Sequence, residues 1–270
     1  DFKIKRAGKT LNQPVDLALV KQFVAPRDFL QKYHKFRLRE LEAYQQLTKD
    51  KPEVKAAGEE FLKAYLFKVT GQPESLSDDE IISLAKKVME LQSNDPLLLT
   101  YVTYVLYEET GDSDAALSLW TQCLEQLRTS QYPQIIQVYL RLFVVDFSSS
   151  VSKGHKDALL VSIVRWLEEA STEQQWLDCV HFKLAGIWEV NDITFRDGLV
   201  VGCLKSEKIE PFIKHWLTGQ RLLDQAWGER RGRYASNMSR GDQLTFQKGI
   251  QMGKAHLEYA CLLRPDSPHP

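Results

Sequence analysis

The chain has 270 residues and a mass of 31.1 kDa, a length that suits one extended repeat domain or two small globular domains. Apolar residues make up 43% of the sequence and charged residues 26%, which is ordinary globular usage and argues against wholesale disorder. The net charge of −1 argues against a nucleic-acid partner, because domains that bind nucleic acids carry an excess of Lys and Arg. No apolar run approaches the roughly 20 residues that cross a bilayer, so we expect no direct membrane insertion.

The charges are unevenly distributed along the chain. Residues 1–70 carry 15 Lys and Arg against 9 Asp and Glu, residues 71–226 carry 13 against 23, and residues 227–270 carry 7 against 4. The two ends are therefore basic and the middle is acidic. In one interpretation, these are charges on solvated helix faces that have no further role. In the other, they steer a charged partner to one surface, or the basic end of one molecule pairs with the acidic middle of another.

Apolar residues recur at steps of three and four residues along most of the chain, which is the period of an amphipathic helix. The first such stretch follows Pro26 and the second follows Pro52. A proline fits the first turn of a helix because its missing N–H would have no partner there. Gly71 is placed to end the second helix.

Two further helices are predicted to begin at capping boxes, in which Ser is followed three residues later by Glu or Gln. Ser77 with Glu80 forms one box, and Ser171 with Gln174 precedes the helix that contains Trp188. The remaining helices are expected over residues 97–109, 113–128, 133–147, 155–170, 191–205, 208–231 and 242–264. No Asn-Gly or Asp-Gly pair lies between alternating apolar residues, so β-hairpins are not expected. The pattern predicts an all-α fold of about a dozen helices.

The segment Asp95–Glu125 has the pattern of two helices joined at Gly111. Tyr107 precedes this glycine by four residues, and Ala116 and Trp120 follow it by five and nine. This spacing resembles the tetratricopeptide repeat, where a small residue lets the second helix approach the first. The segment departs from that repeat at three positions, namely Thr100, Tyr104 and Cys123.

The closing segment Gly253–Pro268 resembles the second helix of the same repeat, with Ala260 and Pro265 five residues apart. The resemblance implies an α-solenoid of antiparallel helix hairpins. We expect residues 1–75 to form an N-terminal helical segment and residues 76–270 to form a tetratricopeptide-like repeat domain.

A second resemblance lies between these repeats and concerns the stretch that begins at Trp227. It is similar to uncharacterised bacterial families of tetratricopeptide-like proteins that share a Trp-x-x-Arg-Gly-x-x-Tyr-Ala segment. The matching residues are Trp227, Arg231 (or Arg230), Gly232, Tyr234 and Ala235. Because those families have no established activity, the resemblance implies only the fold and a bacterial origin.

The sequence lacks the usual catalytic motifs: no G-x-S-x-G elbow, no phosphate-binding glycine loop and no H-E-x-x-H pair occurs. Cys179 and His181 would point about 200° apart on a helix, so they cannot share one metal ion. We therefore expect no metal and no cofactor, and we interpret Cys179 and Cys203 as small buried hydrophobic residues. The six tryptophans have helical spacing and are expected mainly in the core.

Arginines alternate with aromatic residues near the start of the basic C-terminal region. Arg230, Arg231 and Arg233 lie close in sequence to Trp227 and Tyr234. Guanidinium groups bind carboxylates or phosphates with two parallel hydrogen bonds and stack on aromatic rings, so these five residues are our candidate partner-binding site. In the alternative interpretation the arginines cap a helix while the two aromatic residues fill the core.

These patterns favour a non-enzymatic binding or scaffold module that engages another protein or peptide through a concave helical surface. The alternative is an enzyme or small-ligand sensor with a pocket between the aromatic helices and the Arg230–Tyr234 segment. Four widely spaced cysteines do not form a disulfide framework and favour the cytoplasm, with export after signal removal as the alternative. The sequence leaves the oligomeric state open.

Overall fold

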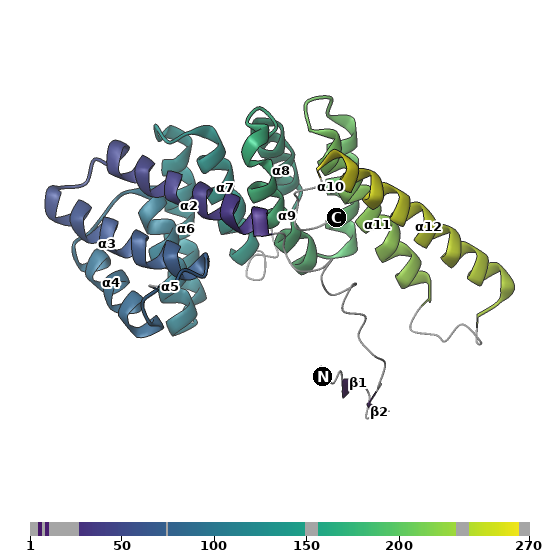
Figure 1. Ribbon diagram of the computed structural model, residues 1–270, viewed down its shortest axis with the longest axis horizontal. Coiled ribbons are helices and arrows are strands. Elements are labelled where there is room, and N and C mark those ends of the chain that lie inside the picture. The colour runs from purple at the N-terminus through teal and green to yellow at the C-terminus, as the bar shows by residue number, and fades with distance from the viewer. Residues whose placement is uncertain are drawn as a thin grey trace.

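The computed structural model describes residues 5–6, 9–10, 27–73, 75–148, 156–230 and 238–264. In this part of the chain it confirms the predicted all-α fold, with eleven α-helices and one short 3-10 helix (Figure 1). The α-helices are α2 (Arg27–Leu47), α3 (Pro52–Val69), α4 (Asp78–Glu90), α5 (Pro96–Thr110), α6 (Ser113–Thr129), α7 (Gln134–Ser148), α8 (Lys156–Ala170), α9 (Leu177–Val190), α10 (Ile193–Lys205), α11 (Pro211–Arg230) and α12 (Arg240–Leu263). The 3-10 helix η1 (Gln174–Trp176) lies just before α9.

A small antiparallel strand pair lies near the N-terminus. The strands β1 (Lys5–Arg6) and β2 (Lys9–Thr10) pair Lys5 with Thr10 and Arg6 with Lys9. Two-residue strands are too short to show an alternation of apolar and polar residues, which is why the periodicity contained no indication of them.

Side chains at the helix starts explain where several helices begin. The capping box before α4 is confirmed, because the Ser77 hydroxyl accepts from the Glu80 N–H and the Glu80 carboxylate accepts from the Ser77 N–H at 2.9 Å. Asp95 caps α5 by accepting hydrogen bonds from backbone N–H groups of its first turn. Pro52 begins α3 as expected, whereas Pro26 lies outside the described residues.

The second predicted capping box is wrong. The Ser171 hydroxyl donates to the Leu167 carbonyl and accepts from the Glu210 N–H, a residue that lies far along the chain. A turn and η1 follow Ser171, and α9 begins only at Leu177. The hydroxyl is committed to a tertiary contact, so it does not cap the helix that follows.

Helices α5 and α6 form the helical hairpin expected from the repeat-like pattern. Gly111 ends α5 with φ 67°, a left-handed conformation that glycine adopts without steric cost. Ala116 and Trp120 are buried, and the Trp120 ring packs edge-on against Tyr107 with centroids 5.7 Å apart. The Trp120 indole N–H also donates to the carbonyl of Thr100, which ties α6 to the first turns of α5.

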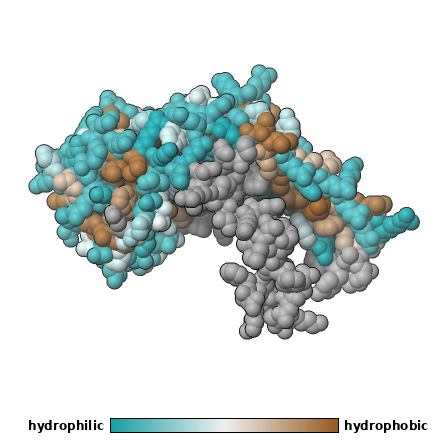
Figure 2. All heavy atoms as spheres, in the orientation of Figure 1, coloured by the Kyte–Doolittle hydropathy of each residue, from teal (hydrophilic) through white to brown (hydrophobic). Residues whose placement is uncertain are grey.

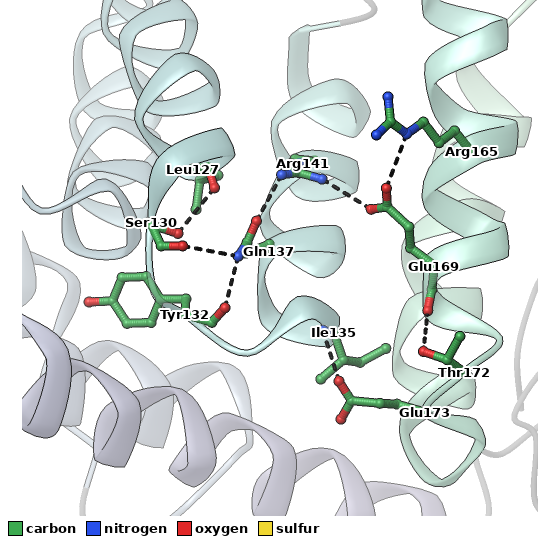
Figure 3. A network of polar contacts seen from close by, with 10 residues as sticks. All are labelled: Leu127, Ser130, Tyr132, Ile135, Gln137, Arg141, Arg165, Glu169, Thr172 and Glu173. Atoms are coloured by element: carbon green, nitrogen blue, oxygen red, sulfur yellow. Dashed lines mark hydrogen bonds and ion pairs between the residues drawn. The ribbon is translucent and has the colours of Figure 1, made fainter.

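A polar network fixes the next helices relative to one another (Figure 3). Arg141 on α7 donates to Gln137 at 2.8 Å and to Glu169 on α8 at 3.3 Å. Burial lowers the pKa of Arg141, and the neighbouring Glu169 carboxylate opposes that effect. Glu173, just after α8, accepts from the N–H of Ile135 in the first turn of α7. Both contacts join the C-terminal end of α8 to the N-terminal half of α7.

The helices follow one another along the length of the molecule, and consecutive helices such as α3 and α4, or α11 and α12, pack together (Figure 1). One hydrophobic core continues from Tyr33 to Ala260. Helices two apart along the chain also pack together, as α7 does with α9 and α8 with α10. Helix α2 contacts α3, α5 and α9. Its Phe36 ring also meets Tyr139 of α7 with centroids 5.0 Å apart. The face shared by these four helices is therefore covered by α2.

Candidate protein-binding surface

A cluster of one cation and two aromatic rings lies at one end of the α11–α12 pair. Trp227 of α11 is 55% exposed, and its ring packs edge-on against Phe246 of α12 with centroids 5.3 Å apart. The Arg230 guanidinium lies 5.1 Å from the centroid of Trp227 and 5.6 Å from that of Phe246. We call these three residues the Trp227 patch. It offers an apolar surface and a cation in the same place.

Close packing of α11 and α12 holds this patch in place. A Cβ atom added at Gly253 would lie 2.9 Å from the Leu223 side chain and 3.0 Å from the carbonyl oxygen of Gly219. A Cβ atom at Gly249 would lie 2.9 Å from the Cβ of Ala226. These contacts are shorter than van der Waals distance, so glycine lets the two backbones approach closer than alanine would. The side chains of Trp227 and Phe246 meet beyond this close contact.

The predicted site is only partly within the described residues. Trp227 and Arg230 come together as the candidate site required. Arg231, Arg233 and Tyr234 lie in residues 231–237, outside the described part of the chain, so their membership stays a prediction. The interpretation that Trp227 fills the core is wrong, because more than half of its surface faces solvent.

Phe246 completes the patch, although it was outside the predicted site. It lies 19 residues after Trp227 in sequence and is brought to it by the packing of α12 on α11. Its helical spacing marks the face of α12 that packs on α11, together with Gly249 and Gly253.

Further apolar side chains are exposed on α12. They are Leu244, Met252, Tyr259 and Leu262. Figure 2 shows hydrophobic residues exposed among hydrophilic ones where α11 and α12 lie. Exposed apolar residues that follow one another along a helix indicate a contact surface, in contrast to single ones scattered over a protein.

A histidine pair joins the same two helices. The Nδ1 atoms of His215 and His256 lie 3.0 Å apart, which requires one ring to donate and the other to accept. Burial, and secondarily the nearby His256, lowers the pKa of His215. Tyr259 packs edge-on against His215 with centroids 4.6 Å apart. The pair therefore links α11 to α12 in its singly protonated or neutral state.

The other concentration of charge lies in the core and does not form an accessible site. Arg37 and Glu40 of α2 form an ion pair with an N–O distance of 2.7 Å, and both are buried. Four tyrosine rings lie within 5.8 Å of the guanidinium, namely Tyr33, Tyr65, Tyr101 and Tyr139. Burial raises the pKa of Glu40, while the Arg37 charge opposes that rise. This cluster fixes α2 to its neighbours.

Three of the four cysteines, Cys123, Cys179 and Cys203, are buried, which confirms the interpretation of the latter two as core residues. Burial raises the pKa of the Cys123 and Cys203 thiols to about 12. Among the described residues, no group of three or more His, Cys, Asp or Glu side chains is arranged to hold a metal ion. In the same part of the chain, no helix is long and apolar enough to span a bilayer.

No family model, no curated protein and no solved structure matches this chain. In the described residues, the chain is an all-α protein whose helices pack against one another. The two family resemblances in the sequence, to the tetratricopeptide repeat and to the Trp-x-x-Arg-Gly-x-x-Tyr-Ala segment, stay predictions.

Proposed function

We propose that this chain is a non-enzymatic protein-binding module of the tetratricopeptide-like, α-solenoid type. In this proposal it captures another protein or peptide through the Trp227 patch. The observation that carries the proposal is the 55% exposed Trp227, held edge-on by Phe246 beneath Arg230. The α5–α6 hairpin, with its left-handed Gly111 and buried Trp120, supports the repeat-like part of the proposal.

The composition of the patch suits a protein partner. Tryptophan and arginine are enriched among residues that dominate binding energy, because a partner can bury a large ring and pair with a planar cation at once. The contacts with Phe246 and Arg230 already restrict the Trp227 side chain, so less conformational entropy is lost on binding. The preferred ligand is a segment that carries apolar side chains and a carboxylate.

The position of α2 also favours this end of the molecule. In tetratricopeptide-like arrays a partner lies against the face that successive helices share. Here α2 covers that face of α3, α5, α7 and α9. A partner would therefore bind to α11 and α12, and not along the face that the successive helices share.

The alternative function, an enzyme or small-ligand sensor, depends on a pocket beside Arg231 and Tyr234. Those residues lie outside the described part of the chain, and the described part contains no observation in its favour.

The proposal is tested by placing a photo-crosslinking amino acid at position 227 in the native cell and identifying the attached peptide by mass spectrometry. The peptide's affinity is then measured by calorimetry for the wild type and for Trp227→Ala. We expect affinity to fall about tenfold or more, the loss expected of a central interface residue. Arg230→Lys, which keeps the charge but not the planar fork, should lose less than Arg230→Ala.

Val161→Ala is the matched control, because Val161 is an exposed apolar residue on α8, remote in sequence from the patch. It should leave the affinity unchanged, and circular dichroism should show equal helix content in all variants. Equal binding by the wild type and Trp227→Ala would overturn the proposal.

A further inference from the structure

Helix α12 exposes a row of six residues on the side that faces away from α11. The row consists of Leu244, Lys248, Gln251, Ala255, Glu258 and Leu262, all of them exposed. Their spacing of 4, 3, 4, 3 and 4 residues is that of the a and d positions of a coiled coil. We call this row the α12 seam. In a coiled coil, these are the positions that a second helix packs against.

Two apolar side chains widen the α12 seam along one edge. Met252 and Tyr259 each follow a seam residue by four positions and are 44% and 48% exposed. At the two ends of the seam, Leu244 and Leu262 are 60% and 78% exposed. The opposite side of the helix, which includes Gly253, packs on α11. One helix face is thus buried within the chain. The other exposes Leu244 and Leu262, with Met252 and Tyr259 at its edge, where the Tyr259 ring also packs against His215 of α11.

The α12 seam is symmetric about Gly253. Leu244 and Leu262 lie nine residues to either side of it, Lys248 and Glu258 lie five, and the remaining seam residues lie two. A two-fold axis at this point would place an antiparallel second copy so that Leu244 meets Leu262 of the partner subunit. Lys248 would then meet Glu258 of the partner subunit. A self-complementary surface of this kind is what a two-fold dimer requires.

The charges select the antiparallel orientation. In a parallel pair, each Lys248 would face another lysine and each Glu258 another glutamate, and both contacts would be repulsive. In the antiparallel pair both contacts join opposite charges. Within one chain Glu258 already lies 3.5 Å from Lys254, but both side chains are largely exposed, so that pair contributes little and leaves Glu258 able to contact a second copy.

We propose that a second copy of this chain is the occupant of the α12 seam, packed antiparallel about a two-fold axis near Gly253. The contact spans the 18 residues between Leu244 and Leu262, which is about 27 Å of helix. At its centre, each Gln251 would face the small Ala255 of the partner subunit, which leaves room for the longer side chain. This inference is independent of the proposed function, because Trp227 packs beside Phe246 on the side of α12 that faces α11.

Charge reversal in the full chain tests the proposal, with the dimer dissociation constant measured by sedimentation equilibrium. Lys248→Glu alone and Glu258→Lys alone each place like charges in both symmetric contacts. We expect each single variant to weaken the dimer about tenfold, since two attractive exposed pairs become repulsive. The double variant restores opposite charges and should return close to the wild-type constant.

A mixture of the two single variants gives the sharpest result. One variant then carries glutamate at both positions and the other carries lysine at both, so the heterodimer has two attractive contacts. We expect the mixture to dimerise more tightly than either variant alone. Lys205→Glu, an exposed charge reversal on α10, is the control and should leave the constant unchanged.

Three outcomes would overturn the proposal: a wild-type chain that stays monomeric into the hundred-micromolar range, a dimer insensitive to the single reversals, or a double variant as weak as the single ones. Circular dichroism of each variant separates loss of pairing from loss of folding. Trp227→Ala should leave the dimer intact, so failure of the dimer and failure of the proposed partner site are distinguishable.

Discussion

At the scale of single residues, Arg37 and Glu40 place opposite charges in the contact between α2 and the helices beneath it. The Tyr101 hydroxyl donates to Glu40 at 2.7 Å and accepts from Arg37, so the pair is also hydrogen-bonded across to α5. Desolvation makes such an ion pair costly to bury. Removing only one partner costs more, because the other charge is then buried without a counter-ion. The cluster therefore fixes the position of α2 more than it adds to stability.

Glu40→Gln should destabilise the protein by about 3–5 kcal/mol, because it leaves the Arg37 charge buried without a counter-ion. Urea unfolding followed by circular dichroism measures the change. Replacing both partners by apolar residues, Arg37→Met with Glu40→Leu, should recover part of the loss. Glu125→Gln, which removes one partner of an exposed ion pair with Arg128, should cost less than about 1 kcal/mol. A similar loss in both single variants would contradict this account.

At the scale of secondary-structure elements, the close packing of α11 on α12 depends on glycine residues, which have no side chain, at several contacts. Alanine is ordinarily the better helix former by about 1 kcal/mol, so glycine within a helix must have a compensating role. At Gly253 the role is steric, since a Cβ atom would collide with Leu223 and with the backbone of Gly219. At Gly228 a Cβ atom would meet nothing within 4 Å.

The same substitution should therefore have opposite effects at these two positions. Gly253→Ala should lower the free energy of unfolding by about 1–3 kcal/mol, because it forces the two helices apart. Gly228→Ala should raise it by up to about 1 kcal/mol through helix propensity alone. Thermal or urea unfolding measures both changes. Two shifts of the same sign would show that backbone contact does not govern the packing of α11 on α12.

At the scale of the whole molecule, contacts between residues far apart in sequence join the N-terminal helices to the rest. Lys32 of α2 pairs with Asp178 of α9, and Arg39 donates to Glu173 at 3.1 Å. Tyr65 of α3 packs against Tyr101 of α5 with ring centroids 5.0 Å apart. The core is shared across these contacts, although the division into residues 1–75 and 76–270 stays a prediction.

We expect residues 76–270 expressed alone to unfold at lower urea concentration than the full chain. Without α2 and α3, the rings of Tyr101 and Tyr139, which are buried in the full chain, would face solvent. Exposed apolar surface of this kind should bind a hydrophobic dye. Dye fluorescence and the unfolding midpoint are the measurements. An unchanged midpoint would instead show that the N-terminal helices contribute nothing to the rest.

The positions of the helices could be predicted from the sequence alone, because periodicity and capping act between residues a few positions apart. Ser77 with Glu80 and the turn at Gly111 are such local features. For the candidate site, the sequence could predict which residue types take part, but not which of those side chains are exposed. Trp188 and Trp227 both have helical spacing, yet one is buried and the other is exposed. Spacing alone does not distinguish them.

Local sequence thus determined the all-α class of the described residues and where helices such as α4 and α5 begin or end. The tertiary structure alone decided which helix faces are covered. Phe246 reaches Trp227 only through the packing of α12 on α11, and Ser171 is drawn away from its cap by Glu210. The physical reason is that burial depends on what packs against a face, and those partners come from distant parts of the chain.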